Sequence, residues 1–437
     1  MSWSTQVPRL AGIGAAWSLY RNPRRSRADL HGFRDARLRE LIGFVYRHVA
    51  FYRNWFDAAG VRPEDIQRAE DLAALPLLSK SELRDAPLQS RLADGVDPAG
   101  LVLHNTSGSS GEPFAIYRTS GEENLLQLLR LRAARQYGFR LLDRRADLTA
   151  PIGGGPKDPV RHTAKALRLA PVESVDTTQA ADKLLRQVAR IKPDVLTGYP
   201  GVLSQAAQRL PDYPDLHIRP RFVVVGGEPL TPLMRKQIEH GFHAPVYDMY
   251  GTNEFNLLAW QCPRGQHLHI CDDAVIVEIL RGGEPVEEGE QGEVVVTGLF
   301  SRTMPFIRYR TGDLATKGPG SCPCGQPFST LGAVVGRTAD YFQVPDGRTI
   351  QPFSILDPVM VYDDAWIEQH QLAQVASDRI LLRVKLRREP RPGERERLMA
   401  AAEEAVRPAQ FELEFVERFE SHPTGKFRSY LSLEDVR

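Results

Sequence analysis

A strand–helix–strand pattern over residues 221–250 constrains the fold of this chain more than any other feature. Residues 221–225, Arg-Phe-Val-Val-Val, indicate a strand whose last four residues are apolar and which is followed by a pair of glycines. Thr231, followed by a proline, suits the N-cap of a helix that we expect to end at Gly241. Residues 246–250 return as a second strand. A connection of this length predicts that the two strands are parallel.

Two polar turns follow these strands. Residues 226–228 leave the first strand, and residues 250–254 leave the second. The carboxyl ends of neighbouring parallel strands lie at one edge of a sheet, where open α/β sheets bind ligands. We therefore expect both turns to line the functional site.

Periodic segments elsewhere indicate helices and an antiparallel region. The pattern predicts an amphipathic helix over residues 33–56 and another over residues 179–191. A capping box of Ser120 and Glu123 predicts the start of a third helix. Residues 273–300, two apolar strands around a Gly- and Glu-rich turn, are typical of an antiparallel β subdomain.

The C-terminal region has its own pattern. A strand at residues 379–386, a helix at 393–406 and a strand at 411–417 predict a small α+β domain. The predicted fold class is therefore α/β. We expect a large N-terminal domain over residues 1–339, with mixed, mostly parallel sheets and a β subdomain, and a small, mobile α+β domain over residues 340–437.

Composition is that of a soluble globular protein. The chain has 437 residues, 42% of them hydrophobic, and its 56 Lys and Arg against 55 Asp and Glu give a formal net charge of +1. This balance makes no case for a general nucleic-acid or anionic-membrane binder. Residues 10–20 are apolar but lack the flanks of a signal peptide, so we expect a buried N-terminal helix there. No run approaches the ~20 apolar residues of a membrane span, and the predicted location is cytoplasmic.

The strongest single motif is residues 105–113, Asn-Thr-Ser-Gly-Ser-Ser-Gly-Glu-Pro. Small hydroxylic residues and glycines let backbone N–H groups and hydroxyls surround a polyphosphate. The run lacks the ending of a Walker A loop, and by itself such a run is more often a flexible loop. His104 precedes it, either as a hydrogen-bonded core residue or as part of a substrate pocket.

Four further motifs favour a nucleotide. Residues 248–254, Asp-Met-Tyr-Gly-Thr-Asn-Glu, offer groups suited to a purine, a phosphate and a divalent cation. Residues 308–313 end in an aspartate suited to a ribose diol. Residues 336–340 and 422–428 complete the series, and the latter contains Lys426, the only lysine of the last fifty residues.

In combination, these motifs resemble those of the adenylate-forming superfamily, which includes acyl-CoA synthetases, luciferases and the adenylation domains of peptide synthetases. Within it, the chain is most similar to the phenylacetate–CoA ligase branch and its capsule-biosynthesis relatives. This placement depends on the patterns at residues 51–83, 227–230 and 308–311. The resemblance covers nearly the whole chain.

The resemblance implies a role for each matching residue. The ATP phosphates would be bound by Ser107, Gly108, Ser109, Ser110 and Gly111. The adenine would be surrounded by Gly227, Glu228, Pro229, Asp248, Met249 and Tyr250, and the adjoining Gly251, Thr252 and Asn253 would also contact the nucleotide. Asp313 would bind the ribose hydroxyls. Three residues would act in catalysis: Glu254 on Mg²⁺, Arg337 on the ribose or α-phosphate, and Lys426 on the carboxylate and α-phosphate. Asp340 would be the hinge of the small domain.

The implied activity is ATP- and Mg²⁺-dependent conversion of a carboxylic acid into an acyl-adenylate, followed by transfer to CoA. The branch alone suggests that the acid is aromatic or short-chain. An enzyme that passes the acyl group to an amine, a carrier protein or a sugar shares the first step. A nucleotide-binding homologue with little catalysis is the remaining alternative. A homodimer is suggested by family analogy alone.

Three departures from the family pattern bear on these alternatives. Asn253 stands where Ser or Thr is usual, and Glu112 stands where the phosphate loop often has Lys. Residues 342–352 lack the longer Gly-containing pattern of typical CoA ligases. That segment shapes the second half-reaction, so the acceptor is the least constrained part of the assignment.

The cysteines indicate a metal site. Cys322 and Cys324, on a tight Cys-x-Cys-Gly turn, would direct two thiolates to one point, and Cys262 with His269 could complete a tetrahedron. Such a closed site would hold structural Zn²⁺, which some members of the branch carry. Cys271 and His267 compete as ligands, and four reduced thiols are the alternative.

Overall fold

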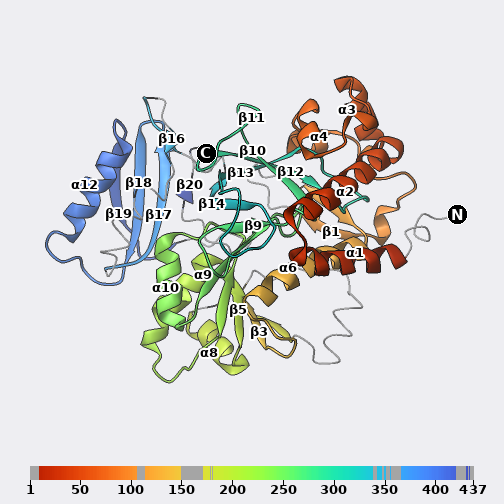
Figure 1. Ribbon diagram of the computed structural model, residues 1–437. Coiled ribbons are helices and arrows are strands. Elements are labelled where there is room, and N and C mark those ends of the chain that lie inside the picture. The colour runs from red at the N-terminus through yellow and green to blue at the C-terminus, as the bar shows by residue number, and fades with distance from the viewer. Residues whose placement is uncertain are drawn as a thin grey trace. The chain divides into compact units, whose positions relative to one another are not determined.

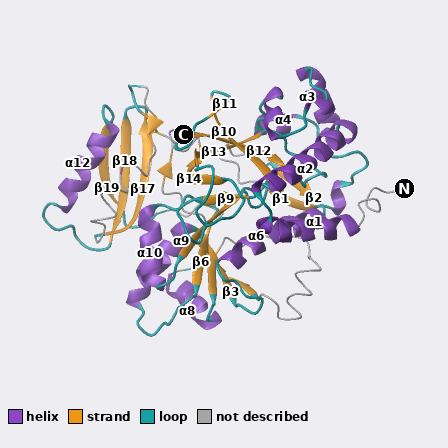
Figure 2. Ribbon diagram, viewed as in Figure 1, coloured by secondary structure: helices purple, strands orange, loops and turns teal. Residues whose placement is uncertain are grey.

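The computed structural model describes the chain in two compact units. The described residues are 9–105, 114–148, 171–177, 179, 181–337, 342–346, 349–350, 355, 366–419, 430–431 and 433. Unit 1 takes its described residues from 9–139 and 249–334, and unit 2 from 140–248 and 335–437. Figures 1 and 2 show the elements of both units.

Unit 2 contains a parallel sheet of strand order β7-β6-β5-β3-β4. Its elements are β3 (Arg145–Leu148), β4 (Val172–Ser174), α8 (Ala181–Ile191), β5 (Val195–Gly198), α9 (Pro200–Arg209), η6 (Leu210–Asp212), β6 (Phe222–Val225), α10 (Pro232–Phe242) and β7 (Val246–Tyr250). The parallel pairing of β6 and β7 confirms the crossover predicted from the sequence.

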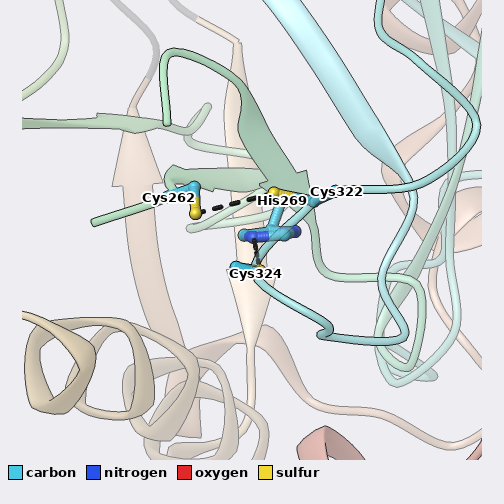
Figure 3. Close-up of side chains that lie close together, drawn as sticks. All are labelled: Cys262, His269, Cys322 and Cys324. Atoms are coloured by element: carbon cyan, nitrogen blue, oxygen red, sulfur yellow. Dashed lines mark hydrogen bonds between the residues drawn. The ribbon is translucent and has the colours of Figure 1, made fainter. Parts of the chain in front are cut away.

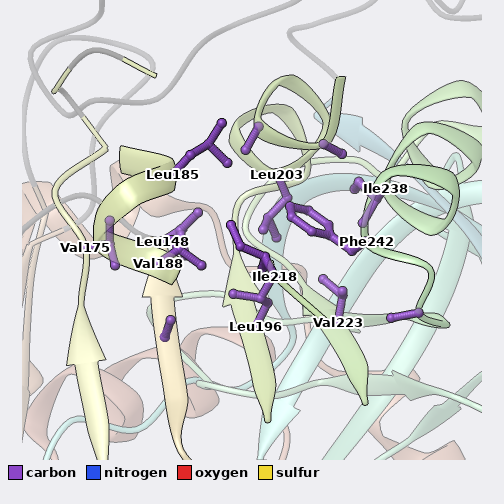
Figure 4. Close-up of a cluster of buried hydrophobic side chains, with 14 of the residues drawn as sticks. Leu148, Val175, Leu185, Val188, Leu196, Leu203, Ile218, Val223, Ile238 and Phe242 are labelled. Atoms are coloured by element: carbon purple, nitrogen blue, oxygen red, sulfur yellow. The ribbon is translucent and has the colours of Figure 1, made fainter. Parts of the chain in front are cut away.

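The three helices bury their apolar faces on this sheet. Leu185, Leu203 and Phe242, one from each helix, are 0–1% exposed and share a core with strand residues such as Leu196 and Val223 (Figure 4). Burial of apolar side chains on this scale is the main force that holds such a layer together.

A second sheet in unit 2 has the order β19-β18-β17-β20. The elements of this region are β15 (Phe342–Gln343), β16 (Thr349–Ile350), β17 (Ile367–Ala376), β18 (Arg379–Leu386), α12 (Glu394–Val406), β19 (Gln410–Phe415) and β20 (Tyr430–Leu431). Strands β18 and β19 are parallel and α12 connects them, which confirms the predicted strand–helix–strand order. Leu233 of α10 packs into the same apolar cluster.

Unit 1 combines N-terminal helices with an antiparallel sheet. Its helices are α1 (Arg9–Arg21), η2 (Asn22–Arg24), α2 (Arg27–His48), α3 (Ala50–Ala59), η3 (Pro63–Asp65), η4 (Ala69–Ala74), α4 (Lys80–Asp85), α5 (Leu88–Arg91), η5 (Pro98–Gly100) and α6 (Ser120–Gln136). Its strands are β1 (Val102–Asn105), β2 (Ala115–Arg118), β8 (Ala259–Gln261), β9 (Leu268–Ile270), β10 (Val275–Arg281), β11 (Glu284–Pro285), β12 (Gln291–Gly298), β13 (Tyr309–Lys317) and most of β14 (Thr330–Arg337). The antiparallel pairing of β10 with β12 confirms the predicted β subdomain.

Local details differ from the sequence-based expectations. The helix predicted over residues 33–56 is two helices, because Val49 adopts an extended conformation between α2 and α3. The capping box at α6 lies one residue earlier, with Thr119 as N-cap and Glu122 as its partner. Gly241 does not end α10; His243 does, in the left-handed conformation at φ 51°. A Cβ on Gly241 would lie 2.6 Å from the Ala207 carbonyl oxygen, so close packing with α9 requires glycine there.

The N-terminal helix is only partly buried. Ala15 and Leu19 of α1 are 5% and 2% exposed, but Trp17 is 60% exposed. In the described part of the chain, no helix combines the length and apolar character needed to cross a bilayer.

Candidate functional site

The turn after β7 depends on a glycine. A Cβ on Gly251 would lie 2.0 Å from the carbonyl oxygen of Asn256, so no other residue fits without moving the backbone. The turn closes with a hydrogen bond from Asn256 N to Thr252 O at 2.8 Å. The Thr252 hydroxyl is buried and has no hydrogen-bond partner in the part of the chain that the structure describes.

This turn places Glu254 against the start of β13. The Tyr309 hydroxyl donates to Glu254 Oε1 at 3.0 Å. Glu254 is 7% exposed and Tyr309 is 1% exposed, and Tyr309 packs edge-on to Phe306. The Tyr309 hydroxyl is a neutral donor that orients the carboxylate and adds no charge, so Glu254 remains suited to a cation.

A second tyrosine–carboxylate pair lies beside the first. Tyr250, at the end of β7, donates to Asp313 Oδ2 at 2.6 Å. Burial raises the pKa of Tyr250 well above its ordinary value, and the charges of Asp313 and Glu254 raise it further. Tyr250 is therefore a fixed donor at neutral pH. Asp313 follows Gly312, whose φ of 76° lies where the pairing register of β13 with β12 shifts.

An arginine connects the turn after β7 to the strands that flank residues 106–113, which are β1 and β2. Arg118, at the end of β2, donates to the backbone oxygen of Asn253 and to Glu123. Glu123 also pairs with His104 Nε2 at 3.0 Å, which fits the interpretation of His104 as a hydrogen-bonded residue. Burial raises the pKa of Glu123, but the bonds from His104 and Gln127 and the Arg118 charge outweigh this effect and lower the pKa to about 2.

Sequence reasoning missed Tyr309, Arg118 and this role of Glu123. Tyr309 lies inside a motif whose other residues were assigned roles. Its aromatic ring was the only sequence feature that could have pointed to it. Arg118 had no signal, because its partner lies 135 positions away in a chain rich in arginine.

Unit 2 holds other residues that the resemblance assigns to nucleotide binding. Gly227, in the turn after β6, has φ 80°, which favours glycine. Glu228 accepts a hydrogen bond from Gly201 N at the start of α9, at 3.2 Å. Val225 is the register partner of Asp248 on β7, so this turn and Asp248 lie at the carboxyl ends of neighbouring strands, as predicted.

Several predicted residues lie outside the described part of the chain. These are Ser107, Gly108, Ser109, Ser110, Gly111, Asp340 and Lys426. Arg337 ends β14, but its side chain is also outside the description. Their roles stay predictions.

The cysteine cluster is a separate feature of unit 1 (Figure 3). One potential ligand atom from each of Cys262, His269, Cys322 and Cys324 lies within 4.8 Å of the other three. His269 Nε2 is 3.2 Å from Cys324 Sγ, and the sulfurs of Cys262 and Cys322 are 3.7 Å apart. The structure thus brings together the four residues named from the sequence.

The two competing ligands are not part of this cluster. Cys271 is fully buried beside Arg132, which forms a two-pronged ion pair with Asp273 at 2.5 and 3.0 Å. Burial raises the pKa of Cys271 to about 12. The backbone oxygen of His267, in the turn before β9, instead accepts a hydrogen bond from Cys262 N at 2.8 Å.

Comparison with known proteins links the chain to a ligase family. Residues 160–302 match the family model described as AMP-binding enzyme. The chain is 28% identical to phenylacetate-coenzyme A ligase of Thermus thermophilus, over 72% of each protein. It is 27% identical to the same ligase of Escherichia coli, over 77% of each, and 22% identical to protein CapK of Staphylococcus aureus, over 56% of this chain and 54% of that protein.

Solved structures agree on the fold. A 2-hydroxyisobutyryl-CoA ligase in the postadenylation state superposes with a TM-score of 0.78 at 21% identity, covering 94% of this chain and 91% of that one. An anthranilate CoA ligase bound to anthranoyl-AMP gives a TM-score of 0.57 at 17% identity, with 76% and 66% covered. The chain is thus a homologue of the phenylacetate–CoA ligases that contains an AMP-binding segment and has the fold of solved acid–CoA ligases.

Proposed function

We propose that the protein activates a carboxylic acid with ATP as an acyl-adenylate and then transfers the acyl group to CoA. The observation that carries this proposal is a pair of tyrosine–carboxylate contacts: Tyr309 with Glu254, which is buried, and Tyr250 with Asp313, which is partly buried. Tyr250 ends β7 and Tyr309 belongs to the Arg-Tyr-Arg-Thr motif, in a homologue of acid–CoA ligases.

The proposed roles follow from charge. A carboxylate reaches the α-phosphorus of ATP only if the repulsion between the two anions is screened. Glu254 would hold Mg²⁺ against the phosphates, with the buried Thr252 hydroxyl and Asn253 beside it. Asp313, an acceptor oriented by Tyr250, would bind the ribose hydroxyls. The stretch from Ser107 to Gly111 would surround the phosphates.

The remaining roles belong to the C-terminal part of the chain. Lys426 would neutralise the charge that builds up between carboxylate and α-phosphate, and Arg337 would bind the ribose or α-phosphate. Residues 340–437 would turn about Asp340, because the adenylate needs a different environment for thiol attack. The relative named 2-hydroxyisobutyryl-CoA ligase has been solved in postadenylation and thioesterification states. We place the protein in the cytoplasm, where both ATP and CoA are present.

Product analysis tests the second half-reaction. The purified chain is incubated with ATP, Mg²⁺, CoA and a panel of aryl and short aliphatic acids. We expect AMP and an acyl-CoA to form in equal amounts with at least one acid. AMP without acyl-CoA, together with acyl transfer to an added amine or carrier protein, would move the assignment to the alternative acceptor.

We also propose that Cys262, His269, Cys322 and Cys324 bind structural Zn²⁺. Three sulfurs and one imidazole nitrogen are a donor set that Zn²⁺ favours. Burial raises the pKa of Cys262 to about 12 and lowers that of His269 to about 4. At neutral pH the imidazole is therefore in the neutral form that binds a metal, whereas the thiol loses its proton only beside a cation. A divalent ion makes a buried thiolate stable, which these surroundings otherwise oppose.

A further inference from the structure

The N-terminal helix α1 exposes an apolar face. In its sequence, Arg9, Ser18 and Arg21 are the only residues with a polar or charged side chain, apart from the tyrosine hydroxyl. Ala15 and Leu19 face the protein, whereas Trp17 and Tyr20 are 60% and 46% exposed. A helix that is apolar all round is normally covered on every side.

Helix α6 extends this apolar surface. Leu128 and Leu131 are each 38% exposed, and with Arg135 they fall on one face of α6 because they are spaced three and seven residues apart. Arg135 lies over the ring of Tyr20 at 6.0 Å, which joins that face to α1. We call Trp17, Tyr20, Leu128 and Leu131 the aromatic patch.

The helix carrying the patch is firmly held. Arg132 of α6 donates to the Leu19 backbone oxygen at 3.2 Å and to Asp273. The Asn22 side chain, fully buried just after α1, donates to Asp273 at 2.9 Å. The exposed rings therefore project from a fixed element.

The surroundings of the patch are strongly basic. The first 28 residues contain five arginines and no acidic residue, whereas the rest of the chain has 51 Lys and Arg against 55 Asp and Glu. Arg21, Arg24 and Arg25 are exposed, and Arg24 lies 5.5 Å from the centre of the Tyr20 ring. The balanced total charge of the chain thus conceals a local excess of positive charge.

We propose that the aromatic patch and these arginines bind the surface of an anionic lipid bilayer. Trp and Tyr prefer the interface between lipid headgroups and acyl chains, and arginines bind the anionic headgroups. At 13 residues, α1 is too short to span a bilayer and would lie along its surface. A second copy fits less well, because a twofold contact through this face would bring its arginines together.

Vesicle sedimentation with the full chain tests the proposal. We expect the protein to sediment with phosphatidylglycerol-containing vesicles and to remain in solution with phosphatidylcholine alone. Each arginine near an anionic surface contributes about fivefold in affinity, so Arg21→Gln, Arg24→Gln and Arg25→Gln together should weaken binding roughly a hundredfold. Trp17→Ser should weaken it about tenfold, and added salt should weaken binding of the wild type.

A matched variant controls for the loss of three charges. Lys183, Arg186 and Arg190 are exposed on α8, and their joint change to glutamine should leave vesicle binding unaltered. Circular dichroism establishes that each variant is folded. The proposal is overturned if the wild type ignores anionic vesicles, which would favour an acidic protein partner, or if both triple variants bind equally. It is also overturned if Trp17→Ser abolishes a lipid-independent dimer seen by ultracentrifugation.

Discussion

The hydroxyl of Tyr309 donates to the carboxylate of Glu254 at 3.0 Å, across 55 positions of sequence. Both side chains are almost fully buried. Because Tyr309 begins β13 and Glu254 follows β7, the contact fixes the proposed Mg²⁺ ligand to a rigid strand. Tyr309 is thus a positioning residue in the proposed mechanism.

Tyr309→Phe should weaken the use of Mg²⁺. A hydrogen bond to a charged group contributes about 1.5–3 kcal/mol, so we expect the Mg²⁺ concentration for half-maximal activity to rise about tenfold. Magnesium titration of adenylation measures this change. Tyr137→Phe is the matched control, since it removes a buried hydroxyl bound to the Gln261 backbone. An unchanged titration in Tyr309→Phe would remove its positioning role.

Gly251→Ala should reduce adenylation by more than about tenfold, because the new Cβ displaces the turn that carries Glu254. Gly32→Ala in α2 serves as a control, since its Cβ meets nothing within 4 Å. That substitution should raise stability by about 0.5–1 kcal/mol, as alanine favours a helix. Comparing activity and melting temperature of the two variants separates the turn from a general effect. Full activity in Gly251→Ala would show that the turn tolerates the shift.

Elements with strong local sequence signals could be predicted from the sequence, whereas a break decided by tertiary packing could not. The residues of β7 and the start of α10 could be read from local pattern, because a buried strand and an N-cap with proline are local signals. The break at Val49 could not, because the helical spacing continues through it and tertiary packing decides.

The candidate site shows the same division. The four-residue cluster around Cys324 was predictable, since few residue types bind Zn²⁺ and their spacing is distinctive. The contact of Arg118 with Asn253 was not, because long-range pairing of a common residue leaves no periodic signal. Glu123 was assigned to the cap of α6, a role that belongs to Glu122 one position earlier.

Metal analysis should find one zinc ion per chain. Cys324→Ser should lose that ion and lower the melting temperature, as should a strong chelator, because a structural metal contributes to folding. Cys271→Ala is the control: this thiol is buried outside the cluster, so the variant should be less stable and still retain zinc. Equal zinc content in wild type and Cys324→Ser would contradict the proposed ligand set.

The free energy of unfolding should decrease as the pH is lowered, because His370 is buried in its neutral form. Burial lowers the pKa of this ring to about 4 from 6.5, and its Nε2 has no partner among the described residues. The unfolded state therefore binds a proton first, so the contribution is complete above pH ~6.5 and is lost as pH falls toward about 4.

The loss should be about 1–3 kcal/mol for this residue. His370→Gln should flatten the fall in melting temperature between neutral and acidic pH, whereas the same change at the exposed His217 should not. Parallel curves for wild type and His370→Gln would show that another group causes the acid sensitivity.

The central claim is acid-dependent adenylation, and ATP–pyrophosphate exchange with CoA omitted measures it most directly. We predict exchange with at least one carboxylic acid from a panel of aryl, aliphatic and amino acids, and its loss in Lys426→Ala and Glu254→Gln. Folded protein that binds ATP yet shows no exchange with any acid would contradict the account.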